Sequence, residues 1–214
     1  MDEEIAIIDA NTKNEKIKYF FINNKKILIV GISTLLLIVT GFFSFEASKK
    51  RNKIKLANQF NLITINYKEN TKQITVNKLT DIINHNDATY SPLALYFLLD
   101  NSLVENNIET NKLFDELINE TNLEKEIKNL IIYKKALFNS DFETENNLLN
   151  ILNPIINSES IWKSHALYLL AEYFYAKNED QKAKEFFKQI LILPNGNTDI
   201  KKKTQKRLNR DLSE

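Results

Sequence analysis

The chain has 214 residues, enough for one membrane anchor and one domain of ordinary size. It carries 29 Lys and Arg against 28 Asp and Glu, and this near-balance argues against nucleic acid as the main partner, because phosphate binding needs a basic excess. Cysteine is absent, which excludes disulfides, thiolate nucleophiles and cysteine-based zinc sites, and the three glycines are too few for a phosphate-cradling loop.

The first predicted element is a transmembrane helix over Ile27–Phe45. These 19 residues carry no charge, and at about 1.5 Å per residue they cover roughly 28 Å, close to the ~30 Å hydrocarbon core of a bilayer. A buried core helix of this length would show a polar face. A signal peptide cleaved after Ala47 would need a small residue at the −3 position of the cleavage site, and Phe45 occupies that position. We therefore expect an uncleaved anchor that contacts the lipid bilayer, preceded by a tail over residues 1–26.

Positive charge flanks both ends of this segment. Five lysines lie within 15 residues on its N-terminal side and five Lys or Arg on its C-terminal side, so the positive-inside rule does not decide the orientation. We expect these charges to keep the helix from sliding through the bilayer rather than to recognise a specific lipid.

A connecting helix is predicted over residues 46–70. Leu56, Phe60, Ile63 and Tyr67 follow one another at steps of 4, 3 and 4, which places them on one helical stripe. The stretch contains neither Gly nor Pro, so the membrane helix is expected to continue into it as a single rod.

Residues 71–214 are predicted to form an all-α domain. Polar breaks with helix-start chemistry, such as Ser91-Pro92, separate segments of helical periodicity. The expected helices are Ile74–His85, Ser91–Glu105, Glu109–Glu120, Leu123–Asn139, Glu143–Ile156, Ile161–Lys177, Asp180–Leu193 and Asp199–Leu212.

These helices pair with a period. The first helices of successive pairs begin near Thr89, Leu123 and Ser160, at spacings of 34 and 37, and the second helices are spaced by 35 and 36. A helix-turn-helix unit that recurs at about 34 residues is the signature of tetratricopeptide stacking, in which each hairpin buries its apolar surface on the next. The sequence therefore predicts a tetratricopeptide-like α-solenoid.

The last pair fits the repeat best. Ala171 and Ala183 occupy the two small positions where the helices of a repeat cross, and Phe187 occupies the aromatic position. Around Tyr133 the small crossing residue is expected to be missing.

Four residues of this last repeat are candidates for partner binding. They fall at positions that tend to line the concave groove of such arrays, where Tyr and His side chains could hold an extended peptide or a partner helix. The alternative is that they only pack against the preceding hairpin. The candidates are His165, Tyr168, Glu172 and Tyr175.

No catalytic residue, cofactor site or metal site is expected. His85 lies in an Asn-rich loop and should be solvated, and Trp162 should fill the core. Carboxylate pairs such as Asp115-Glu116 and Glu179-Asp180 fall on polar helix surface or turns, without the burial that acid–base catalysis needs. We expect a protein that is not an enzyme, with no small-molecule substrate.

The order of these segments resembles a known family. An acidic start (Asp2-Glu3-Glu4) leads through a lysine-bearing stretch (Tyr19–Lys26) to one membrane helix, a connecting helix, degenerate pairs such as LEKEIKNLIIYKKALFNSDFETENNLLNILNPI and the closing IWKSHALYLLAEYFYAKNEDQKAKEFFKQILILPNGNTDIKKKTQKRL. This resembles the tetratricopeptide repeat-like domain proteins of proteobacteria, the family that includes the ancillary subunit of the SecYEG translocon. The resemblance implies a bacterial inner-membrane protein with a cytoplasmic tail and a periplasmic domain, whose partners are translocon subunits, periplasmic chaperones and exported chains.

Two further interpretations stay open at this point. The same architecture could serve as a structural assembly factor for another envelope or outer-membrane complex. It could also be a membrane adaptor whose domain faces the cytoplasm. The leading expectation is a non-catalytic interaction scaffold held at the membrane, where the anchor raises its local concentration.

Overall fold

The computed structural model describes residue 16 and residues 18–212, and within these residues every regular element is a helix. The chain divides after Lys55 into two compact units. The all-α prediction is therefore confirmed for the described part of the chain. The predicted tail, residues 1–26, falls mostly outside the described residues, and its last two residues belong to the first long helix.

One helix, α2 (Lys25–Ile65), contains the whole predicted membrane segment and most of the predicted connecting helix. Among the described residues it is the one helix long and apolar enough to cross a membrane, and its apolar side chains are exposed. Thr34 and Thr40 donate their hydroxyls to backbone carbonyls one turn earlier, at 2.8 and 2.9 Å, so these two hydroxyls are satisfied without water. The prediction of one uninterrupted helix is confirmed.

The helix ends earlier than expected. Asn66 donates its side-chain amide to the carbonyl of Leu62 at 2.8 Å, and the chain leaves the helix there. A short 3₁₀ helix, η1 (Glu69–Thr71), follows. The connecting segment therefore stops at Ile65 rather than near residue 70.

The second unit continues with eight α-helices. Each lies where the sequence predicted one, with ends that mostly differ by one or two residues. In chain order they are α3 (Lys72–Ile83), α4 (Tyr90–Asp100), α5 (Asn107–Glu120), α6 (Lys125–Asn139), α7 (Glu145–Ile156), α8 (Lys163–Ala176), α9 (Asp180–Ile192) and α10 (Thr198–Asp211).

The end of α4 was predicted wrongly. The helix stops at Asp100 rather than Glu105, because Ser102 has a φ of 51° and turns the chain out of the helix. Leu103 is buried after this turn, so its position in the sequence fits the apolar stripe of α4 although it lies outside the helix. Asn86 and Asn178 take the same left-handed conformation after α3 and α8, so three polar residues end helices where glycine is more usual.

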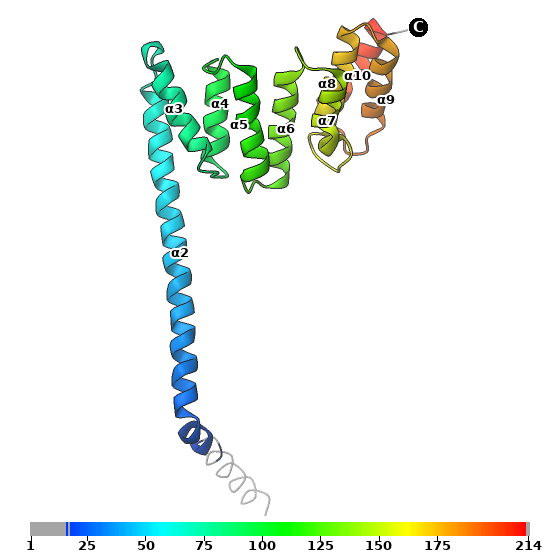
Figure 1. Cartoon of the computed structure of the whole chain (residues 1–214). Helices are drawn as coiled ribbons and strands as arrows, with labels where there is room; N and C mark the ends of the chain where they lie inside the picture. Colours follow the sequence, from blue (N-terminus) through cyan, green and yellow to red (C-terminus); the bar gives the residue numbers. More distant parts are fainter. Residues whose placement is uncertain (1–15, 17, 213–214) are drawn as a thin grey trace, which may run out of the picture. The chain divides into compact units, whose positions relative to one another are not determined.

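Packing runs along the chain from one helix to the next (Figure 1). Neighbouring helices contact each other, and the contacts between alternate helices join α3 to α5, α6 to α8 and α8 to α10. The most extensive contact is between α8 and α9, where Ala171, Ala183 and Phe187 are fully buried. The small residues predicted for this helix crossing are therefore in place.

The expectation that the preceding pair lacks its small residue is wrong. Ala136 on α6 is fully buried in the same core as α7 and α8, and it lies 35 residues before Ala171. The expected starts of these two first helices, Leu123 and Ser160, are 37 residues apart and place the small position at Lys134, two residues before the buried alanine.

Hydrogen bonds between successive helix pairs repeat this spacing. Thr121 donates to Asn86, the backbone N–H of Ile161 donates to Glu126, and Arg207 donates to Glu172. Each pair is 35 residues apart in sequence. The three bonds involve different groups at different positions of the helix pair, and what they share is the separation along the chain.

Candidate functional site

The four predicted groove residues all lie on α8 and face its two alternate neighbours. His165 contacts the side of α6. Its ring centroid is 5.9 Å from that of Tyr133 and 5.2 Å from that of Trp162. The Nδ1 atom of His165 is buried and has no hydrogen-bond partner among the described residues. This histidine therefore belongs to a packed aromatic cluster.

The other three residues contact α10 or its surroundings. Arg207 donates a hydrogen bond from Nε to Oε1 of Glu172 at 2.8 Å and a second one from Nη2 to Oε2 of the same carboxylate. The centre of its guanidinium lies 4.6 Å from the centroid of the Tyr175 ring. Tyr168 hydrogen-bonds Glu172 and meets Phe187 edge-on at 5.5 Å. The structure thus groups three of the four predicted residues around Arg207, which already binds the Glu172 carboxylate, and it places His165 in a different cluster.

The electrostatics of this cluster follow from burial and from Arg207. Burial alone would raise the pKa of Glu172, but hydrogen bonds from Arg207 and Tyr168 outweigh it and lower that pKa. Burial, with the hydrogen bond to Glu172, raises the pKa of Tyr168 to about 12. The cluster is a satisfied ion pair at neutral pH, and it has no free general base.

A second group of side chains, on α4 and α6, is not covered by α10. We call it the α4–α6 face, defined by Leu93, Tyr96, Ile127, Lys134 and Leu137. Its three aliphatic side chains are 41%, 40% and 49% exposed. The ammonium of Lys134 lies 4.6 Å from the centroid of the Tyr96 ring and joins the two helices. Burial raises the pKa of Tyr96 to about 12, and its hydroxyl has no partner among the described residues.

A pocket of about 370 Å³ opens at one end of this face. Leu99 and Val104 line it from α4 and the loop after it, and Lys134, Leu137 and Phe138 line it from α6. Sequence reasoning missed this surface. The signal was present, because Ile127, Leu130, Lys134 and Leu137 follow at steps of 3, 4 and 3.

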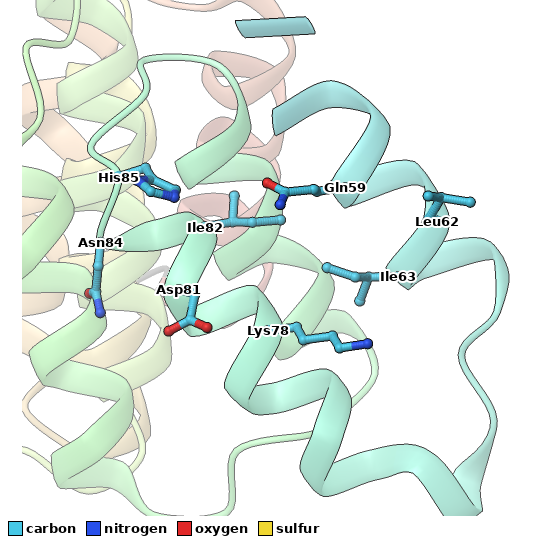
Figure 2. A pocket seen from close by; sticks show the side chains of 8 residues that line it. All are labelled: Gln59, Leu62, Ile63, Lys78, Asp81, Ile82, Asn84 and His85. Carbon is cyan, nitrogen blue, oxygen red and sulfur yellow. The ribbon is translucent and has the colours of Figure 1, made fainter. Parts of the chain in front are cut away.

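A second pocket, of about 580 Å³, lies where the end of α2 meets α3. Figure 2 shows Gln59, Leu62 and Ile63 on α2 opposite Lys78, Asp81 and Ile82 on α3, with Asn84 and His85 in the turn that follows. His85 is exposed, as the sequence predicted. Its lining combines the apolar side chains of Leu62, Ile63 and Ile82 with one ammonium group, one carboxylate and one imidazole.

No part of the described chain brings together three or more His, Cys, Asp or Glu in a group that could hold a metal ion. The other sequence-predicted residues are dispersed. Asp115 pairs with Lys135 at 2.6 Å, and Trp162 is half-buried with its indole N–H donated to the carbonyl of Glu126 at 3.1 Å. The indole therefore links the start of α8 to α6 and fills a gap between them, in agreement with its predicted packing role.

Protonation of His165 is expected to destabilise the fold. Burial, and next the charge of Lys203, lower the pKa of His165 below its usual 6.5. The unfolded chain then binds a proton at a pH where the folded chain does not, so stability falls as the pH drops below about 6.5 and levels off below the folded pKa. Urea unfolding midpoints at pH 7.5 and 5.5 should differ in the native protein, and His165→Gln should reduce that difference. His85→Gln, in the exposed turn, is the control and should leave the difference unchanged.

The comparisons with known proteins complete the description of the site. No family model, no curated protein and no solved structure matches this chain. Its function therefore has to be inferred from its own residues and their arrangement.

Proposed function

We propose that this protein is a non-catalytic interaction scaffold, anchored in a membrane by α2 and carrying a tetratricopeptide-like helical array. The observation that carries the proposal is the continuity of α2. A helix with an exposed, uncharged apolar stretch runs without interruption into the first residues that pack with α3. Exposed apolar side chains over a length close to ~30 Å fit a lipid environment.

The tetratricopeptide-like assignment is supported by repetition. Hydrogen bonds recur at a separation of 35 residues, and small residues are buried at matching points of α6 and α8. Such arrays bind protein segments on the surface formed by successive first helices. In this chain α10 contacts that surface at the α8 end, while the α4–α6 face stays open.

The α4–α6 face is therefore the proposed partner surface. Exposed aliphatic side chains offer apolar contact area, and Lys134 supplies one charge without a carboxylate partner among the described residues. An amphipathic protein segment would match this pattern. In keeping with the family resemblance, we propose that the partners are translocon subunits, periplasmic chaperones or exported chains, and that the domain is periplasmic on a bacterial inner membrane.

The topology is tested first, because the flanking charges do not decide it. The chain has no native cysteine, and Asn195 is exposed in the turn between α9 and α10, so Asn195→Cys creates a single accessible thiol. Intact cells are treated with a maleimide that crosses the outer but not the inner membrane. Labelling is expected. Labelling that appears only after the inner membrane is lysed would place the domain in the cytoplasm and refute the export role.

The second candidate is an assembly factor for another envelope complex. It shares the same anchor and array, so the structure favours neither over the other. Proteins that co-purify with the full chain and are lost in Leu137→Glu separate the two: translocon subunits favour the scaffold, and subunits of another complex favour the assembly factor.

A further inference from the structure

Charge is segregated along the second unit. Between Leu56 and Trp162 there are 8 Lys against 15 Asp and Glu, whereas between Lys163 and Leu212 there are 11 Lys and Arg against 6 Asp and Glu. The nearly neutral total therefore hides a local charge of −7 followed by one of +5. Fields of opposite sign on one molecule favour association between unlike ends.

The most positive and the most negative local net charges lie on two segments of similar length. Helix α10 holds six Lys and Arg against two Asp, and the segment Glu109–Glu126 holds six Asp and Glu against two Lys. Their net charges are +4 and −4. The acidic segment covers most of α5 and the start of α6, and α5 and α10 both have 14 residues.

Many of these charges have no partner within one copy. Lys202, Lys203 and Lys206 are exposed, and none makes an ion pair with the described residues, whereas Arg207 and Arg210 of the same helix are paired. In the acidic segment, the exposed carboxylates that make no ion pair within the described part of the chain are Glu109, Glu120 and Glu124.

The two segments pack against different helices within a single copy. The extensive contacts of α10 are with α8 and α9, and those of α5 are with α3, α4 and α6. Glu109 and Glu120 are eleven residues apart, about three helical turns, and so lie on one side of α5. One side of α5 therefore presents negative charge that α10 of the same copy does not neutralise.

We propose that α10 of one copy of this chain binds the acidic segment Glu109–Glu126 of a second copy. A twofold axis makes the contact reciprocal, because each copy presents both segments and each interface is used twice. A second copy is the occupant whose charge pattern matches, because its three exposed carboxylates without an ion pair in the described chain would face three such lysines. An anchor in a shared membrane would raise the effective concentration of the two copies.

The test uses the full chain in detergent micelles, as an equal mixture of unlabelled and nitrogen-15-labelled protein. A carbodiimide joins lysine amines to carboxylates without a spacer. Mass spectrometry is expected to find α10 lysines linked to α5 carboxylates of the other isotope. The yield should fall at about 1 M salt, where the Debye length is only about 3 Å.

Charge reversal supplies the matched variants. Reversing the three α10 lysines to glutamate should lower the inter-copy yield by about tenfold or more, because like charges across an interface oppose binding. Reversing the three acidic residues to lysine in the same chain should restore it. The control changes three exposed lysines elsewhere by the same total charge and should not lower the yield. The α10 variant is Lys202→Glu, Lys203→Glu and Lys206→Glu; the compensating changes are Glu109→Lys, Glu120→Lys and Glu124→Lys; the control, outside both segments, is Lys68→Glu, Lys78→Glu and Lys188→Glu.

Three results would overturn the proposal. The first is that cross-links form only within one copy. The second is an inter-copy yield that does not change with salt or charge reversal, and the third is that the α10 lysines bind anionic vesicles while no inter-copy link forms. The last result would assign the lysines to a lipid surface. Circular dichroism of each variant checks that these exposed substitutions leave the helices intact. The test needs neither a translocon nor a particular side of the membrane, so it can fail while the topology result stands.

Discussion

With Leu36 and Val39 both replaced by arginine, the protein is expected to leave the membrane fraction. Both side chains lie at the centre of the apolar stretch of α2 and are exposed. An arginine at the centre of a membrane helix costs about 2.5–3.5 kcal/mol on insertion scales, so the pair costs about 5–7 kcal/mol. That is enough to reverse the partition of a single 19-residue anchor.

Alkaline extraction followed by sedimentation measures the effect as the soluble share of the full chain. The control adds the same charge to the same helix beyond its apolar part, as Asn58→Arg with Asn61→Arg, where both native side chains are exposed and polar. The control protein should stay in the pellet. If the central variant sediments as well as the native chain, α2 is not the anchor.

Phe187→Ala is expected to destabilise the second unit by about 3–5 kcal/mol, the usual cost of removing a fully buried phenylalanine. The ring fills the crossing of α8 and α9 and meets Tyr168 edge-on. Alanine would leave a cavity in the core that Phe187 shares with Ala171 and Ala183, whose side chains are too short to fill it.

Urea unfolding followed by helix circular dichroism gives the change in free energy. Phe142→Ala provides the matched control, because that ring is 46% exposed and should cost well under half as much. Equal losses for the two variants would mean that the α8–α9 crossing is not a packed core.

The positions of the helices could be predicted from the spacing of apolar residues, because each helix buries one stripe of apolar side chains. The mistakes came from residues whose local role is not visible in a pattern. Ser102 in a left-handed conformation ended α4 before a buried Leu103 that continued the apolar stripe. Ala136 was not predicted as the small crossing residue, because an expected helix spacing of 37 instead of 35 residues moved that position to Lys134. Both mistakes concern where a turn falls, which depends on a single backbone conformation.

The candidate site was predictable in part. All four candidates lie on α8, but His165 packs against Tyr133 and Trp162, and the binding of Glu172 and Tyr175 by Arg207 was not predicted. A signal existed, since Arg207 follows Glu172 by 35 residues, close to the predicted repeat. The open α4–α6 face was missed because exposure depends on how neighbouring helices cover a stripe, and the sequence does not show that cover.

The neighbour-to-neighbour packing also has a consequence for folding kinetics. The extensive helix contacts of the second unit join elements that are adjacent or next but one in sequence, so little loop entropy is lost in forming them. The α8–α9 hairpin, with the most extensive contact and a short turn, can form before the rest and act as a nucleus. Local unfolding is expected to start at the end of the array, where a helix has the fewest neighbours. Helix α10 makes its extensive contacts with α8 and α9, so it can detach without disturbing the core of α3–α5. The local stability of this unit should therefore differ along the chain.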